Sequence, residues 1–246
     1  MVWNQFAQRS REPELIDGDC HDRAEYLDCL ADLRQINRYL GGLRPVTRHL
    51  YPLIEKLGLR KVRLLDVGTG SADIPAMIVE WGRARGVNID FTVIDLNHLA
   101  ATEARAQVAA YPEIRVVRAN ALEMPFADGA FDFVLASLFL HHFDEEESAA
   151  MLRGFARVAR VAFLVNDLRR HPLAYFSIKV LTRLFTRNRL IRHDAAVSVL
   201  RGFTDRDLAA MAQRAGLALE VHRHFPYRYL LTGSNHHDDG RSTEDI

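Results

Sequence analysis

A run of small and acidic residues at positions 64–75, LLDVGTGSADIP, has the composition of a ligand-binding turn. Gly68 and Gly70 follow an apolar segment that ends at Asp66-Val67, and a helical pattern follows them. Glycine permits positive φ and lets a ligand lie against the backbone, and the helix start offers free N–H groups. We therefore expect this turn to bind a nucleoside-containing ligand.

A second acid, Asp95, ends the next apolar segment along the chain. A carboxylate at this place can accept hydrogen bonds from both hydroxyls of a ribose, although it could also only cap the helix that follows. Asp73 occupies the position of the third glycine of a dinucleotide-binding G-x-G-x-x-G motif. An anion there would repel a pyrophosphate, so a cationic ligand without phosphate is favoured over NAD.

His141, His142 and Asp167 are candidates for proton transfer. They follow or end two further apolar segments, and ligands of such folds bind at the carboxyl ends of strands. A phenol or enol acceptor, with a pKa of about 10, must lose a proton before it attacks, and an imidazole can take one near neutral pH. In the alternative interpretation the histidines form the turn into a helix predicted over 145–158, which Asp144 caps, and Asp167 is a cap or an ion-pair partner of Arg169 or Arg170.

Other histidines raise the question of a metal. His222 and His224 alternate along a predicted strand and could share an ion, but no third ligand is evident nearby in the sequence. His236-His237 lies in a polar tail. The sequence therefore predicts no metal site.

Several ordered motifs resemble those of one enzyme family. LLDVGTGSADIP is similar to motif I of the class I S-adenosylmethionine (SAM)-dependent methyltransferases, and Asp95 to their second-strand acid. Asn120-Ala121-Leu122, within RANALEMPF, resembles their adenine loop, and FDFVLASLFLHHF resembles their fourth strand and the turn after it. The resemblance extends from Arg60 to Gly233 and is closest to the branch that acts on quinones, phenols and other small metabolites.

The resemblance implies SAM as the cofactor, with S-adenosylhomocysteine as its product. It places the following residues at the cofactor: Asp66, Gly68, Gly70, Asp95, Leu96, Asn120, Ala121 and Ser137. Two positions depart from the family pattern, because Ala72 replaces its third glycine and Asn120 replaces a common acid.

The expected activity is methyl transfer to a small, aromatic or apolar acceptor, with O-methylation of a phenolic or polyketide-like hydroxyl as the main reading. The alternatives are C-methylation of a quinone precursor and a protein that binds SAM or its product without turnover. A nucleic-acid or protein substrate is disfavoured, because there is no basic domain and no Asn-Pro-Pro-aromatic motif after the fourth strand.

The elements that must position these residues alternate in type. Short β-branched or aromatic runs are separated by helical patterns, which predicts a parallel sheet with helices on both faces. With two closing segments around Pro226, the predicted fold is α/β, a Rossmann-like, mostly parallel seven-stranded sheet with a closing antiparallel hairpin and an N-terminal helical cap. The predicted strands are 61–67, 88–95, 114–119, 131–138, 161–167, 217–225 and 227–233.

We divide the chain into a helical cap (1–59), a SAM-binding domain (60–233, with an insertion or lid at about 170–200) and a disordered tail (234–246). Helices are expected at 24–40 and 45–57, and the first could cover the pocket with Arg38 or Tyr39. The helical stretch 173–193 has an apolar face and is basic without an acid. It is either a lid that also touches an anionic membrane or an amphipathic helix with a solvated face.

The composition agrees with an ordinary globular enzyme. The 246 residues include 32 Lys and Arg against 32 Asp and Glu, so no net charge favours nucleic acid. Two cysteines, no signal-peptide pattern and no bilayer-length apolar run predict a cytoplasmic protein that does not span a membrane. We expect a monomer or a homodimer.

Overall fold

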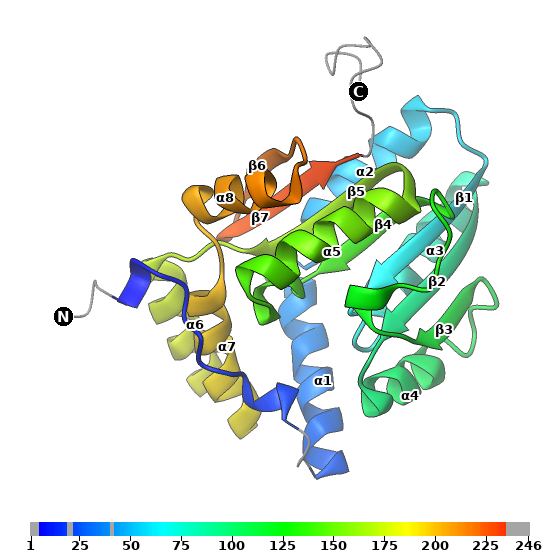
Figure 1. The fold of residues 1–246 in the computed structure, drawn as a ribbon. Helices are drawn as coiled ribbons and strands as arrows, with labels where there is room; N and C mark the ends of the chain where they lie inside the picture. The colour runs from blue at the N-terminus through cyan, green and yellow to red at the C-terminus, as the bar shows by residue number, and fades with distance from the viewer. Residues whose placement is uncertain (1–4, 19–21, 40–41, 235–246) are drawn as a thin grey trace.

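The computed structural model describes residues 5–18, 22–39 and 42–234, without the side chains of 37–39 (Figure 1). The predicted disordered tail therefore lies almost wholly outside the described residues. One seven-stranded sheet has the strand order β3-β2-β1-β4-β5-β7-β6. The first five strands are parallel, and β7 runs antiparallel to both β5 and β6. The predicted fold class is confirmed.

The strands lie close to their predicted bounds, since most of them are buried runs of β-branched and aromatic residues, whereas the two edge strands are largely exposed. They are β1 (Lys61–Val67), β2 (Asn88–Asp95), β3 (Ile114–Arg118), β4 (Phe131–Ser137), β5 (Ala159–Leu168), β6 (Glu220–His224) and β7 (Arg228–Gly233). The carboxyl ends of β1, β2, β4 and β5 therefore meet at one edge, where the candidate site residues were predicted to lie.

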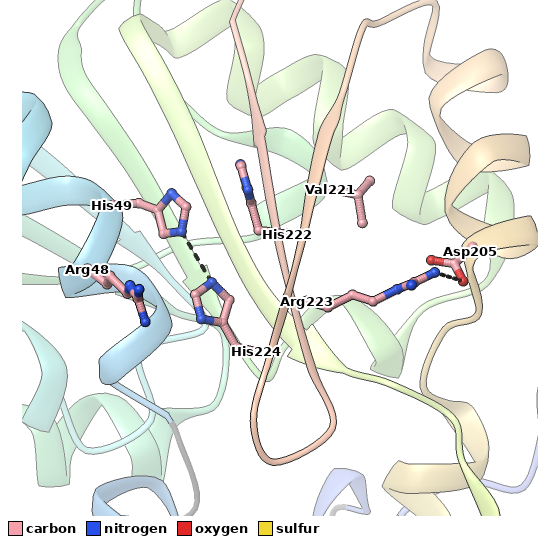
Figure 2. Close-up of a pocket in the computed structure, with 7 residues that line it drawn as sticks. All are labelled: Arg48, His49, Asp205, Val221, His222, Arg223 and His224. Atoms are coloured by element: carbon pink, nitrogen blue, oxygen red, sulfur yellow. Dashed lines mark hydrogen bonds and ion pairs between the residues drawn. The ribbon is translucent and has the colours of Figure 1, made fainter.

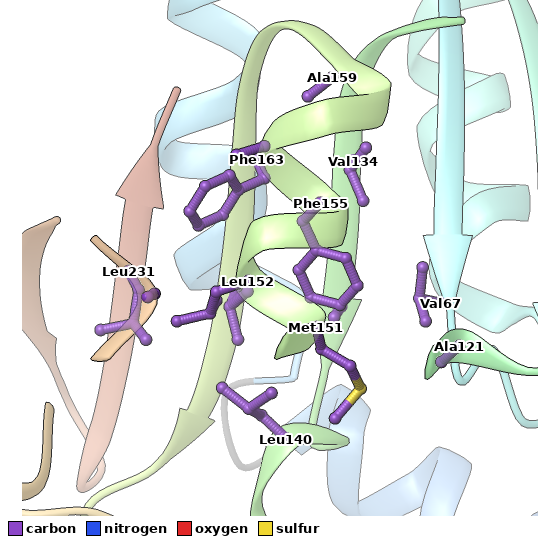
Figure 3. Packing of buried hydrophobic residues seen from close by; sticks show 14 of the residues in the cluster. Val67, Ala121, Val134, Leu140, Met151, Leu152, Phe155, Ala159, Phe163 and Leu231 are labelled. Carbon is purple, nitrogen blue, oxygen red and sulfur yellow. The ribbon is translucent and has the colours of Figure 1, made fainter. Parts of the chain in front are cut away.

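Two helices cover one face of the sheet, α5 (Glu145–Val158) and α8 (Asp205–Ala215). Figure 3 shows Leu152 and Phe155 of α5 packed over the sheet residues Val134, Phe163 and Leu231, all of them buried. Burial of such side chains contributes about 1.5–3 kcal/mol each. Both helices begin with a capping box, at Asp144 and at Thr204, and the first confirms the predicted cap at Asp144.

The opposite face is covered by α2 (Arg44–Lys56), α3 (Asp73–Arg85) and α4 (His98–Gln107). Val46, Leu50 and Ile54 of α2 are buried in the same cluster as residues of β1 and β2. The helix predicted at 45–57 is thus a layer of the sheet domain, and of the two N-terminal helices only α1 lies in a capping position. The division of the chain at residue 59 stays a prediction.

Helix α1 (Arg23–Tyr39) lies across the carboxyl edge of the sheet and joins two other helices (Figure 1). Tyr26 and Leu30 pack on Ala100 of α4, whereas Cys29 packs on Leu190 and Ile191 of α7.

The stretch 173–193 is not one helix. It forms α6 (Pro172–Phe185) and the start of α7 (Arg189–Arg201), because the side chain of Asn188 accepts hydrogen bonds from the N–H groups of Leu190 and Ile191 and caps a new helix. None of the described helices is long and apolar enough to cross a bilayer.

The N-terminal segment runs over α7 before it reaches α1 (Figure 1). Ser10 N–H donates to the carbonyl of Leu200 (3.1 Å). The N–H groups of Leu15 and Ile16 donate to the Asp194 carboxylate, at 2.7 and 2.9 Å. This path carries Glu14 to the carboxyl edge of the sheet.

Candidate active site

The glycine turn joins β1 to α3 as predicted. Gly68 and Gly70 have φ of +70° and +55°, values that favour glycine. The N–H of Gly70 donates to Asp95 Oδ2 (3.0 Å), so the carboxylate at the end of β2 holds the turn. The other oxygen of Asp95 accepts from Asn97 N–H (2.9 Å). A carboxylate offers about four acceptor positions, so Asp95 keeps capacity for a ligand hydroxyl.

Gly68 and Gly70 are needed for different structural reasons. A Cβ on Gly70 would have no heavy atom within 4 Å, so the backbone there faces open space that a ligand can approach. A Cβ on Gly68 would lie 2.1 Å from Cδ2 of Phe139. Gly68 is therefore required by the packing of the Phe139 ring, a role that the motif alone did not predict.

Ala72, which replaces the third glycine of the family pattern, keeps the left-handed backbone with φ of +57°. Its side chain is buried among core residues. The departure therefore costs local strain of about 1–2 kcal/mol.

Three carboxylates gather at this turn. Burial, with the charges of Asp73 and Asp95 adding to it, raises the pKa of Asp66 to about 7. Burial also raises the pKa of Asp73 and that of Asp95. A buried group of mutually repelling acids is stabilised by a cation. The residues present therefore fit the sulfonium and ammonium of SAM, and they fit a phosphate ligand badly.

The predicted adenine loop lies beside the ends of β2 and β3. Asn120 Oδ1 accepts from Leu122 N–H (3.0 Å) and starts a short helical turn over Ala121–Glu123. The side chain of Leu96 is exposed, and its carbonyl accepts from Nε of Arg118 (2.9 Å). Contact of Leu96, Asn120 and Ala121 with a cofactor stays a prediction.

Ser137, at the end of β4, supports the chain between the N-terminal helices. Its hydroxyl donates to the carbonyl of Gly42 (3.2 Å), and Nδ2 of Asn166 donates to the same carbonyl (2.7 Å) and to Ser137 Oγ (2.8 Å). The ends of β4 and β5 thus fix the residues just before α2. The role of Ser137 in cofactor binding is a prediction that nothing here tests.

The three predicted proton-transfer residues belong to one connected group. Nδ1 of His141 lies 2.7 Å from Oδ1 of Asp167, and both side chains are buried. The backbone N–H of His141 donates to Oδ2 of Asp167 (3.2 Å). Asp167 therefore orients His141, and its burial keeps it from direct contact with an acceptor.

Glu14 closes the group from the N-terminal segment. Its Oε1 lies 3.4 Å from Nε2 of His141, and its Oε2 lies 3.9 Å from Nε2 of His142. Nδ1 of His142 lies 3.0 Å from Oδ2 of Asp17. The side chain of His142 is 20% exposed, so it is the histidine that a substrate can reach.

The charges in this group compensate one another. Burial lowers the pKa of His141, but the carboxylates of Asp167 and Glu14 outweigh it and raise the pKa to about 9. Burial raises the pKa of Glu14, but the two histidines outweigh it and lower the pKa to about 2. The charge of His142 also acts on Asp95, which links this group to the glycine turn.

Helix α1 covers part of this edge. Arg34 pairs with Glu103 of α4 (3.3 Å), and Arg189 of α7 pairs with Glu25 (2.6 Å). The side chains of Arg38 and Tyr39, which were predicted to reach the pocket, lie outside the described residues. A lid function of α1 stays a prediction.

Sequence reasoning missed Glu14, Phe139 and the pairing of Asn166 with Ser137. Glu14 lies in an irregular polar segment with no local signal, and Phe139 reads as an ordinary aromatic residue of a strand end. Only the meeting of distant segments gives these residues their places.

A separate cleft lies between α2 and the β6–β7 hairpin (Figure 2). His49 of α2 supplies a third imidazole beside His222 and His224, with Nε2 of His49 and Nε2 of His224 separated by 3.2 Å. Burial and the neighbouring histidines lower the pKa of His49 to about 4. Arg48, Arg223 and Asp205 also line this cleft; Asp205 pairs with Arg223 (2.6 Å), and the positive charge of Arg48 disfavours a cation there.

Comparison with known proteins identifies the sheet domain. Residues 64–162 match a family described as "Methyltransferase domain". The chain is similar to a demethylmenaquinone methyltransferase of Roseiflexus sp., 35% identical over 121 residues that make up 45% of each protein. It also resembles a mitochondrial 2-methoxy-6-polyprenyl-1,4-benzoquinol methylase of Leishmania donovani, 35% identical over 118 residues, 43% of this chain and 40% of that protein.

The alignments thus span less than half the length of these two relatives. The fold is similar to that of a SAM-dependent methyltransferase from Aquifex aeolicus, with a TM-score of 0.60 at 15% identity over 87% of this chain and 98% of that one. The strand order, the glycine turn with its acids and the family match agree on one assignment. The chain contains a class I SAM-dependent methyltransferase domain.

Proposed function

We propose that this protein transfers a methyl group from SAM to a ring carbon of a quinone-type aromatic acceptor in its reduced, hydroxyl-bearing form. The observation that carries the proposal is the position of the His141–His142 turn beside the acidic glycine turn, at one edge of the sheet. The names of the relatives, among them a "Ubiquinone/menaquinone biosynthesis C-methyltransferase" of Rickettsia typhi, favour carbon methylation of quinone-type acceptors over the O-methylation predicted from the sequence.

The acidic turn has the chemistry to hold the cofactor. Asp95 would accept from the ribose hydroxyls, Gly70 leaves open space against the backbone, and Asp66 and Asp73 supply negative charge for a cationic group. When bound, SAM supplies an activated methyl group on a sulfonium. Since that leaving group needs no further activation, the protein mainly aligns the acceptor and excludes water.

The acceptor must become a carbon nucleophile. Removal of a proton from its hydroxyl raises electron density at the neighbouring ring carbon, which forms the new bond to the methyl group as the bond from methyl to sulfur breaks. The ring carbon then loses its own proton to solvent, aromaticity returns with the negative charge on the hydroxyl oxygen, and that oxygen takes back a proton from the histidine. We assign proton removal to the group of His141, His142 and Asp167, in which His142 is within reach of the acceptor and Asp167 positions His141.

The exposed surface of α6 suggests that the acceptor is taken up from a membrane. Leu173, Phe176, Val180 and Leu184 recur at helical spacing and are exposed, and Phe185 beside them is 80% exposed. Lys179, Arg183 and Arg187 are exposed on the same segment, and no acid occurs in α6. An apolar stripe with basic neighbours fits the interface of an anionic bilayer, in which a polyprenyl quinone would be dissolved.

The decisive experiment uses the full chain with methyl-13C SAM and two panels of acceptors, reduced naphthoquinones or benzoquinones and simple phenols. Carbon-13 NMR of the product distinguishes an aryl C-methyl from an O-methyl group. We expect C-methyl products from the quinols, and a His142→Ala variant is expected to lose at least 100-fold in rate, whereas His222→Ala in the separate cleft keeps full rate. Methylation of phenolic oxygen alone would replace this proposal with O-methylation. SAM binding without any transfer would indicate a non-catalytic binding protein.

A further inference from the structure

Three side chains of metal-binding type meet where the N-terminal segment crosses the turn after β4. A ligand atom from each of Glu14, His141 and His142 lies within 4.8 Å of the other two. Glu14 and His141 are buried, and His142 is half-buried at the rim. Two imidazoles and one carboxylate are a set that recurs at zinc sites with an open position.

The spacing fits one ion better than it fits direct hydrogen bonds. Ligands at zinc distances of about 2.0–2.2 Å in a tetrahedral arrangement lie about 3.3–3.5 Å from one another. Nε2 of His141 lies 3.4 Å from Oε1 of Glu14, within this range, and Nε2 of His142 lies 3.9 Å from the other oxygen, Oε2, a little beyond it. Both separations exceed the usual 2.7–3.2 Å of an N–H···O bond. Oε1 of Glu14 is also buried without a hydrogen bond among the described residues.

Each histidine is oriented from behind by its own carboxylate. Nδ1 of His141 donates to Asp167 (2.7 Å), and Nδ1 of His142 donates to Asp17 (3.0 Å). Such bonds fix the tautomer that leaves Nε2 as the ligand atom and make the imidazole a better donor to a metal. Both Nε2 atoms consequently face Glu14.

The backbone on both sides of the cluster is held in place. The guanidinium groups of Arg9 and Arg201 donate to the carbonyl of His141 (3.2 and 3.0 Å), from the side of the main chain. Leu15 and Ile16, next to Glu14, are fixed by Asp194. The three ligand groups are therefore prearranged by the fold, which reduces the cost of assembling a site on binding.

We propose that Glu14, His141 and His142 bind one divalent metal ion, with zinc as the best fit and one coordination position open to an oxygen ligand. This proposal replaces our prediction from the sequence that there is no metal site. That prediction rested on the lack of a third ligand near His222 and His224 in the sequence. The His49–His222–His224 cluster is the poorer candidate, because Arg48 lies beside it and the carboxylate next to it, that of Glu220 at 3.6 Å from Nε2 of His222, is exposed.

The metal site stands on its own geometry, but its use in catalysis rests on the proposed function. A zinc ion at this place would coordinate the hydroxyl oxygen of the methyl acceptor. As a Lewis acid it would stabilise the ionised form of that hydroxyl, as zinc does for a bound water. The histidines would then act on the acceptor through the ion.

The test uses the full chain without an affinity tag, stripped with a chelator and dialysed. Zinc is titrated by calorimetry in competition with a chelating indicator, and Co²⁺ is added to a second sample for visible absorption. We expect one zinc ion per chain with a dissociation constant of micromolar or lower, and intense Co²⁺ bands typical of tetrahedral coordination. His142→Ala and Glu14→Gln are expected to weaken zinc binding at least 100-fold, and Asp17→Asn about 10-fold to 100-fold.

Two controls locate the ion. His222→Ala in the separate cleft and the double variant His236→Ala/His237→Ala in the tail should bind zinc as the parent does. Because Glu14 is buried and its variant could fail to fold, His142→Ala, at the rim, is the deciding variant, with circular dichroism as the check on folding. No zinc binding by the parent, or zinc binding that survives His142→Ala in a folded protein, overturns the metal site. Methyl transfer is measured separately, so zinc binding without turnover would leave the site standing and remove only the proposed function.

Discussion

Oδ1 of Asp167 and Nδ1 of His141 are separated by 2.7 Å, although the two residues are 26 positions apart in the sequence. The contact joins the carboxyl end of β5 to the turn after β4 and is buried on both sides. It explains why an imidazole with two carboxylate neighbours can be accommodated in the interior, since each charge has a compensating partner.

Asp167→Asn should destabilise the protein by about 3 kcal/mol, because a buried ion pair loses one partner while the other stays buried. Urea unfolding of the chelator-stripped protein measures this free energy. Asp17→Asn is the matched control, since it removes a half-exposed carboxylate from the neighbouring histidine and should cost about 0–1 kcal/mol. Equal losses for the two variants would contradict the central role of the Asp167–His141 pair.

Gly68→Ala should destabilise the fold more than Gly70→Ala. Both residues have positive φ, which costs an alanine about 1–2 kcal/mol, but only the Cβ at position 68 would collide with the Phe139 ring. The double variant Gly68→Ala/Phe139→Ala should therefore recover part of the loss, with a coupling of about 1 kcal/mol or more. Urea unfolding of the parent, Gly68→Ala, Phe139→Ala and the double variant gives the coupling, and strict additivity would mean that Phe139 does not constrain position 68.

Asp95→Ala should weaken SAM binding by about 1.5–3 kcal/mol, because a charged acceptor of the ribose hydroxyls is lost. Calorimetry with SAM measures the affinity. Asp90→Ala, on the same strand but paired with Arg115 at the surface, should bind SAM as the parent does. Unchanged affinity in Asp95→Ala would leave Asp95 with a role only in holding the Gly70 turn.

Binding of SAM should release protons from Asp66 in a pH-dependent way. The pKa of this carboxyl is about 7 in the free protein, so it is mostly protonated at pH 6 and mostly ionised at pH 8.5. A cationic ligand favours the ionised form and lowers the pKa, so binding should release up to about 0.9 proton at pH 6 and almost none at pH 8.5.

Calorimetry in two buffers that differ in ionisation enthalpy counts these protons. Asp66→Asn removes the titrating group and should abolish the difference between the two pH values. A proton count at pH 6 that is the same in Asp66→Asn as in the parent would assign the release to another group.

Leu184→Glu should reduce binding to anionic vesicles. Leu184 is 71% exposed on the apolar stripe of α6, and a charge there opposes insertion into the interface. Co-sedimentation with vesicles of mixed neutral and anionic lipids, at low salt, measures the bound fraction. Leu57→Glu adds the same charge at an exposed apolar residue after α2 and should leave binding unchanged. If the parent does not sediment with the vesicles, α6 does not contact a membrane.

The sequence by itself determined the order of strands and helices, because hydrophobic periodicity, caps and glycines act over a few residues. The runs at 61–67, 88–95 and 145–158 became β1, β2 and α5 with the same bounds. The glycine turn and Asp95 were also predictable, since a strand, a turn and a helix are contiguous in the chain. The break between α6 and α7 was missed, although Asn188 carried a capping signal.

Only the tertiary structure decided which side chains meet across the carboxyl edge of the sheet. The pairing of Glu14 with His141 and His142 depends on the path of the N-terminal segment over α7, and that of Asp167 with His141 depends on the adjacency of β4 and β5. His49 reached His222 and His224 only because α2 packs beside the closing hairpin. Such contacts arise from packing between segments that are distant in sequence, and local patterns carry no information about them.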